Sequence, residues 1–149
     1  LIKEIDKLVG KGTIREEVIA QIGVSDYIPQ NLTYHKFLSA NEFELYQNKA
    51  DLIISHAGTG ALIGALKKEK KVIAVPRLYR YGEHIDDHQT QISSVLAGEG
   101  YLREVLDMDK LGETILEALN HPITKKYDRP SNIISLIEAF IDNNENKVR

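Results

Sequence analysis

The chain has 149 residues, a formal net charge of −3 and no cysteine. Its length fits one domain, or one lobe of a two-lobed enzyme. The lack of cysteine excludes structural disulfides and cysteine-ligated zinc, and the small negative charge gives no electrostatic case for nucleic-acid binding. No apolar run approaches the roughly 20 residues that span a bilayer.

Strands and helices are predicted to alternate along the chain. Short apolar or β-rich runs predict strands over residues 17–22, 33–38, 52–54, 71–76 and 101–105. Helical spacing of apolar residues predicts helices over residues 1–9, from 41, from 61 to 66, from 86 to 97, from 107 or 109 to 119, and from 130 or 131 onward. Asn41 and Glu44 fit a capping box. This alternation predicts an α/β fold, a doubly wound sheet with helices on both faces.

A glycine loop follows the predicted strand 52–54. Residues 55–60 read Ser-His-Ala-Gly-Thr-Gly, and a helix comes directly after them. Gly58 and Gly60 allow a tight turn and a close approach of the backbone, and a helix N-terminus favours phosphate. With the strand 71–76 this makes a parallel βαβ unit, and we expect a diphosphate ligand at its carboxyl edge. A plain βα turn is the alternative.

A second loop, residues 76–89, leads from the strand 71–76 to the next helix and reaches the same sheet edge. Its polar and aromatic residues suit a nucleotide-sugar: arginines for phosphate, tyrosines for stacking, and hydrogen-bonding groups for sugar hydroxyls. These residues are Arg77, Arg80, Tyr79, Tyr81, His88 and Gln89, with Asp87 as a candidate helix cap.

Other interpretations of the same residues stay open. His84, Asp86, Asp87 and His88 are all metal-ligand types, and the loop also fits a solvated connection. His56 either points into the crevice or is a buried histidine with its hydrogen bonds satisfied.

Three motifs together resemble the C-terminal domain of the MurG-like glycosyltransferases of family 28. They are residues 54–60 (Ile-Ser-His-Ala-Gly-Thr-Gly), 72–76 (Val-Ile-Ala-Val-Pro) and 87–89 (Asp-His-Gln). The resemblance covers most of the chain and includes the subunit that adds the second N-acetylglucosamine to dolichol in N-glycan assembly. It is strongest to the small PssE-type subunits of bacterial capsule and exopolysaccharide synthesis, which share Pro-Arg-x-x-x-Tyr-Gly-Glu-His-x-Asp-Asp-His-Gln.

The resemblance implies one Rossmann-like domain over residues 1–149, half of a GT-B enzyme, which lacks the family's N-terminal strand. It implies an inverting, metal-independent hexosyl transfer from a UDP-sugar to a lipid-linked acceptor, without a further cofactor. A membrane-anchored partner subunit would hold the chain at the cytoplasmic, inner face of the membrane. The implied donor-binding residues are Ser55, His56, Ala57, Gly58, Thr59, Gly60, Arg77, Glu83, His88 and Gln89, with the backbone of Phe37 and Leu38 at the uracil.

The chain departs from the family pattern at one position that matters. MurG-like sequences carry a ribose-binding glutamate in the helix after the glycine loop, and Gly64 stands at the matching place. No catalytic base is assigned, and neither the sugar nor the acceptor is identified. Two other functions are considered: a non-catalytic interaction module of a transferase complex, and an NADP-binding oxidoreductase that uses Gly58, Gly60 and Gly64.

Overall fold

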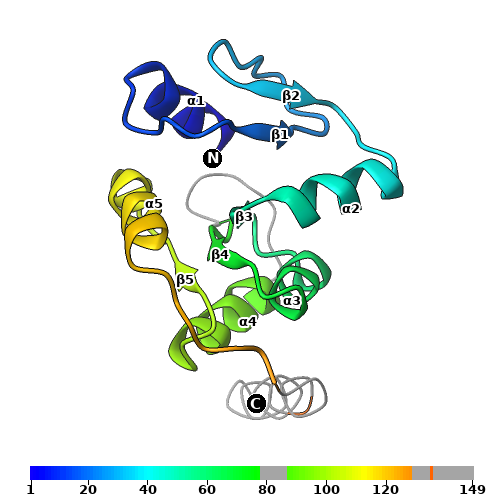
Figure 1. Cartoon of the computed structure of the whole chain (residues 1–149), viewed down its shortest axis with the longest axis vertical. Coiled ribbons are helices and arrows are strands. Elements are labelled where there is room, and N and C mark those ends of the chain that lie inside the picture. The colour runs from blue at the N-terminus through cyan, green and yellow to red at the C-terminus, as the bar shows by residue number, and fades with distance from the viewer. Residues whose placement is uncertain (78–86, 129–134, 136–149) are drawn as a thin grey trace, which may run out of the picture.

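A computed structural model of the chain describes residues 1–77, 87–128 and 135, and describes the backbone alone for residues 87–90. The helices are α1 (Ile2–Gly10), α2 (Ala40–Lys49), α3 (Thr59–Lys67), α4 (Asp87–Gly98) and α5 (Leu111–Asn120), the last preceded by the 3₁₀ turn η2 (Met108–Lys110). The strands are β1 (Ile19–Gln21), β2 (Thr33–His35), β3 (Leu52–Ser55), β4 (Lys71–Ala74) and β5 (Arg103–Glu104). The predicted α/β class is confirmed (Figure 1). The helix expected from residue 130 or 131 lies outside the described residues.

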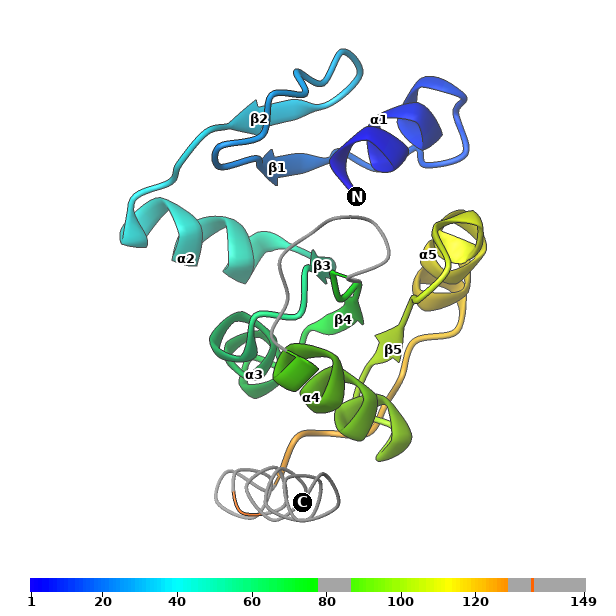
Figure 2. The same cartoon turned by 180° about the vertical axis from the view of Figure 1, so that it is seen from behind.

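The strands form two parallel sheets, whereas the sequence predicted one. One sheet is β1–β2, and the other has the order β3–β4–β5. Within the described residues no strand pairing joins β1 to β3, and α2 runs between the two sheets (Figure 2). Alternating strands and helices predict parallel direction, but they do not determine which strand edges meet.

β3 is less buried than β4. Its side chains from Leu52 to Ser55 are half-buried, whereas Val72, Ile73 and Ala74 of β4 are buried. The reason is position in the sheet, because β4 has a paired strand on both edges and β3 has one on a single edge in the described structure. β4 is therefore the centre of the larger sheet.

The strands other than β3 are also shorter than predicted. β2 ends at His35 and β4 at Ala74, where the predictions ran to residues 38 and 76. A strand extends only as far as the strand it pairs with, and β1 pairs with β2 over three residues.

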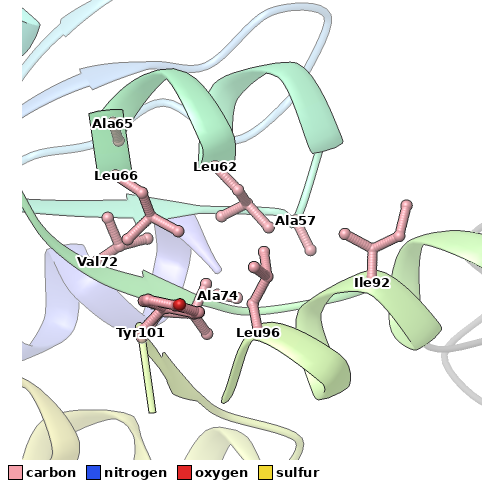
Figure 3. Close-up of a cluster of buried hydrophobic side chains, with 10 residues drawn as sticks. Ala57, Leu62, Ala65, Leu66, Val72, Ala74, Ile92, Leu96 and Tyr101 are labelled. Atoms are coloured by element: carbon pink, nitrogen blue, oxygen red, sulfur yellow. The ribbon is translucent and has the colours of Figure 1, made fainter. Parts of the chain in front are cut away.

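Side chains of β4 alternate between two cores. Val72 and Ala74 belong to a cluster built mainly from α3 and α4, including Leu62, Leu66 and Leu96 (Figure 3). Ile73 and Val75 belong to a second cluster, formed with residues of α1 and α5 and with Val105, which directly follows β5. Helices therefore cover both faces of this sheet, as the fold class requires.

The second cluster holds the two sheets together. It combines Ile5 and Ile14 from the N-terminal part with Leu111 and Ile115 of α5. α1 and α5 approach closely, since a Cβ added at Gly112 would lie 3.0 Å from Leu8 Cδ2. Apolar packing thus replaces strand pairing as the link between the sheets.

A different residue caps α2 from the one predicted. Ser39 is the N-cap, its hydroxyl accepts from Glu42 N–H at 3.2 Å, and Glu42 Oε2 accepts from Ser39 N–H at 2.9 Å. Hydrogen bonds from the Ser39 backbone and then its hydroxyl lower the pKa of Glu42. The capping box is real, but it begins two residues before Asn41.

A buried carboxylate joins α1 to the loop after β1. Asp6 is 2% exposed and accepts hydrogen bonds from Tyr27 Oη at 2.5 Å and from the backbone N–H groups of Gln30 and Asn31, the latter at 2.7 Å. Burial raises its pKa, but these hydrogen bonds together outweigh burial and lower the pKa. No pattern in the sequence predicted this hydrogen-bonded carboxylate.

Within the described residues, no helix has both the length and the apolar character needed to cross a membrane.

Candidate functional site

The carboxyl edge of the larger sheet is one row of residues across three strands. Ser55 is paired with Ala74, and Ala74 with Glu104, and each is the last residue of its strand. The glycine loop leaves from the first strand of this row, and Pro76 and Arg77 follow the second. The structure therefore places the beginnings of both predicted loops at one edge.

The glycine loop ends in an uncapped helix. Gly58 is the N-cap of α3, no side chain caps the helix, and the first helical bond runs from Leu62 N–H to Gly58 O at 3.0 Å. N–H groups of the first turn are left without a helical acceptor, and together with the helix dipole they favour an anion. Thr59 and Gly60 are the first two helical residues, so both lie at this positive end.

The space around Gly58 and Gly60 leaves room for a ligand. The turn itself depends on Ala57. A Cβ added at Gly58 or Gly60 would meet no atom of the described structure within 4 Å. The residue with left-handed backbone is Ala57, with φ of 67°, and its methyl group is fully buried. Gly58 and Gly60 were expected to make the tight turn, but Ala57 has the left-handed backbone instead. Gly58 has φ of −61°, and Gly60 is a helical residue of α3.

His56 connects two strand ends. Its Nδ1 lies 3.2 Å from the carbonyl oxygen of Val75, and because a carbonyl only accepts, Nδ1 carries the proton in this bond. His56 is half-buried. The ring is therefore hydrogen-bonded within the protein, and the residue stands at the carboxyl edge of the sheet.

In the described structure α4 spans Asp87–Gly98, so His88 and Gln89 lie in its first described turn. Their side chains are not described. Asp87 itself lies within α4, rather than at the N-cap position that was expected for it. Arg77 is exposed three residues after β4. Glu83, together with Tyr79, Arg80, Tyr81, His84 and Asp86, lies outside the described residues.

Phe37 and Leu38 follow β2, in the sheet that does not contain the glycine loop. Phe37 is 68% exposed. Leu38 N–H donates to Gln21 Oε1 at 3.0 Å, so this backbone donor is already occupied. The structure therefore does not place these two residues on the sheet edge from which the glycine loop departs.

Glu104 was not predicted as a site residue. Its carboxylate accepts hydrogen bonds from the hydroxyls of Ser93 and Ser94 on α4, the latter at 2.9 Å to Oε2. The sequence places these residues on separate predicted elements, and a Ser-Ser pair on a helix carries no recognisable signal.

A metal site finds no support in the part of the chain that is described, where no three histidine, aspartate or glutamate side chains gather. The four ligand types of the second loop are not tested, because their side chains lie outside the description.

Comparison with known families gives one match that covers nearly the whole chain. The model of the glycosyltransferase family 28 C-terminal domain matches residues 1–142. This range includes every residue that the sequence placed in the donor site.

Three curated relatives carry the name UDP-N-acetylglucosamine transferase subunit ALG13. The protein from Candida glabrata is 30% identical over 91 residues, 60% of this chain and 42% of its own length. Those from Cryptococcus neoformans and Debaryomyces hansenii are 31% and 30% identical, over 36% and 42% of their own lengths. The chain thus matches about two-fifths of these relatives. Their names concern an N-acetylglucosamine transferase and not capsule or exopolysaccharide synthesis.

Proposed function

This chain belongs to the glycosyltransferase family 28 C-terminal domain family, and from that premise we propose that it is the donor-binding, catalytic subunit of a UDP-sugar glycosyltransferase. One observation carries the proposal: an uncapped helix N-terminus and the first turn of α4 follow two strands of one parallel sheet at its carboxyl edge. Open sheets of this kind bind ligands outside the carboxyl ends of their strands.

The proposed roles follow from charge and hydrogen bonding. The diphosphate lies at the N-terminus of α3, cradled by Ser55, His56, Ala57, Gly58, Thr59 and Gly60. Arg77 neutralises phosphate charge. His88 and Gln89, with Glu83, contact the donor sugar, whose hydroxyls need both donors and acceptors. The backbone of Phe37 and Leu38 reads the uracil through groups other than Leu38 N–H, which already donates to Gln21 Oε1.

The finer assignments are proposals supported by the names of the relatives and by the family resemblance. The relatives are named as subunits, which supports a partner subunit, here one that is membrane-anchored and presents a lipid-linked acceptor at the cytoplasmic face. Transfer is inverting and metal-independent. The relatives' names favour UDP-N-acetylglucosamine, and the PssE-type resemblance favours a hexose for capsule or exopolysaccharide.

Calorimetric titration of the chain, alone and with its partner, tests the donor site. The ligands are UDP and its conjugates with N-acetylglucosamine, galactose, glucose and glucuronic acid, with NADPH as the competing dinucleotide. We expect UDP binding that Gly58→Val abolishes. The valine fits the free protein, because Gly58 has φ of −61° and ψ of 120°, an extended conformation, and a Cβ there meets nothing within 4 Å.

Gly98→Val is the matched control, since Gly98 also has open space around its Cβ and lies at the far end of α4. No UDP binding with or without the partner would refute the proposal. Tight NADPH binding would favour the oxidoreductase instead, and transfer activity that survives Gly58→Val in the complex would favour a non-catalytic module.

A further inference from the structure

We propose that Glu104 is a positioning residue of the donor site, which fixes the start of α4 by binding Ser93 and Ser94. The inference rests on the function proposed above and adds a residue to it. Glu104 is the last residue of β5 and shares the register row of Ala74 and Ser55, from which the glycine loop departs. The hydrogen bonds of Glu104 therefore lie at the same sheet edge as the proposed donor site.

The contact is polar and directional. Oε1 of Glu104 accepts from the hydroxyls of Ser93 and Ser94, and Oε2 accepts from Ser94 at 2.9 Å. Ser93 is fully buried, while Glu104 is half-buried. Among the described residues Glu104 forms no ion pair, so in this part of the chain two hydroxyls of one helix orient its carboxylate. Hydrogen bonds to an ionised acceptor are stronger than neutral ones.

Apolar packing alone would leave α4 free to turn about its axis. Ile92 and Leu96 bury this helix in the first cluster, but hydrophobic contact is non-directional. Hydrogen bonds from two successive residues to one carboxylate restrict both rotation and sliding of the helix. Glu104 therefore adds a directional constraint to the apolar packing of this helix.

The constraint reaches the proposed sugar contacts through the helix itself. Ser93 lies five positions after His88, and Ser94 lies five positions after Gln89, a distance of about 7.5 Å along a helix axis. Over so short a distance the helix is rigid. Rotation at the serines would move the first turn by the same angle.

Two variants test the hydrogen bonds between Glu104 and the two serines. Glu104→Gln keeps the size but loses the charge and one acceptor atom. Ser94→Ala removes the exposed hydroxyl and replaces serine with a better helix former, so a disturbed first turn cannot be blamed on helix propensity. Glu99→Gln is the control, a neutralised exposed carboxylate just beyond α4.

Affinities for UDP and for UDP-N-acetylglucosamine are measured for each variant. We expect both test variants to lower the affinity for UDP-N-acetylglucosamine about tenfold, a change of ~1.4 kcal/mol in binding free energy. The affinity for UDP should change little, because the first turn of α4 contacts the sugar. The double variant should lose little more affinity than either single variant, since both substitutions break the same set of hydrogen bonds. An equal loss for both ligands, unchanged affinities, or additive losses would overturn the proposal.

Amide hydrogen exchange at Gln91 and Ile92, whose N–H groups donate to the carbonyls of Asp87 and His88 in an α-helix, tests positioning without any ligand. Exchange there should quicken in both test variants and stay unchanged in Glu99→Gln, while β4 amides keep wild-type rates. If the wild-type chain binds no sugar nucleotide, the proposed function fails, and exchange alone still decides the role of Glu104. Unchanged exchange at both residues would refute that role.

Discussion

Asp6 should make folding sensitive to acid. Hydrogen bonds hold its folded pKa below the usual 3.8, outweighing burial. A lowered folded pKa adds stability above the unfolded pKa, and this stability is lost as the pH falls through the folded value. We therefore expect Asp6→Asn to lower the free energy of unfolding at pH 7, because the amide NH₂ would face other donors, and to reduce the loss of stability below about pH 4.

Urea unfolding at pH 7 and pH 3 measures both effects. Asp26→Asn is the control, an exposed carboxylate in the same loop. Equal acid sensitivity of Asp6→Asn and the wild-type protein would contradict the assignment.

Glu69 stores backbone strain after α3. Its φ is 57°, in the left-handed region, and its N–H donates to Leu66 O at 2.9 Å. Glu69→Gly and Glu69→Ala both lose the exposed ion pair with Lys126, which is 3.0 Å long and worth little. Only glycine relieves the strain, so the glycine variant should be more stable than the alanine variant by about 1 kcal/mol in thermal unfolding. Equal stability of the two would show that the strain is absent.

At the residue scale, the sequence predicted which residues form the glycine loop better than it predicted their backbone conformations. It singled out residues 55–60 because glycines between a strand and a helix are recognisable. It did not show that Ala57 takes the left-handed conformation, since that depends on burial of its methyl group among Leu62 and its neighbours in the first cluster. Glu104 with Ser93 was equally invisible, because the contact arises only when β5 and α4 pack together.

The cap of α2 can be tested at the scale of one element. α2 has no buried residue, so its stability depends strongly on its termini. Ser39→Ala should destabilise the protein or the helix by about 1 kcal/mol, whereas Asn41→Ala should change it by less than about 0.5 kcal/mol. Urea unfolding with amide exchange of α2 distinguishes them, and a larger effect at Asn41 would restore the cap that the sequence predicted.

Element types were predictable and their ends were not. The sequence contains two overlapping cap patterns, Ser39 with Glu42 and Asn41 with Glu44, and local spacing alone does not choose between them. The structure uses the first, because Ser39 has the extended backbone of an N-cap, with ψ of 160°. Strand ends likewise depend on the partner strand, which no single segment of sequence specifies.

At the scale of the whole molecule, the alternation of strands and helices predicted the class, and pairing decided the rest. Parallel direction and helices on both faces of β4 follow from pattern. The division into β1–β2 and β3–β4–β5 depends on edges far apart in the sequence. What unites the two sheets is the second cluster, in which Ile5 and Ile73 both lie.

This shared cluster predicts cooperative unfolding of the two sheets. Ile5 is 5% exposed on α1, next to the smaller sheet, and Ile5→Ala should cost about 2–5 kcal/mol. Because the cluster includes β4, exchange protection should fall at β4 amides as well as at β1 amides. Ile28→Ala is the control, since Ile28 is 44% exposed. Loss of protection at β1 alone would show that the N-terminal part unfolds independently, and that packing between α1 and α5 does not couple the sheets.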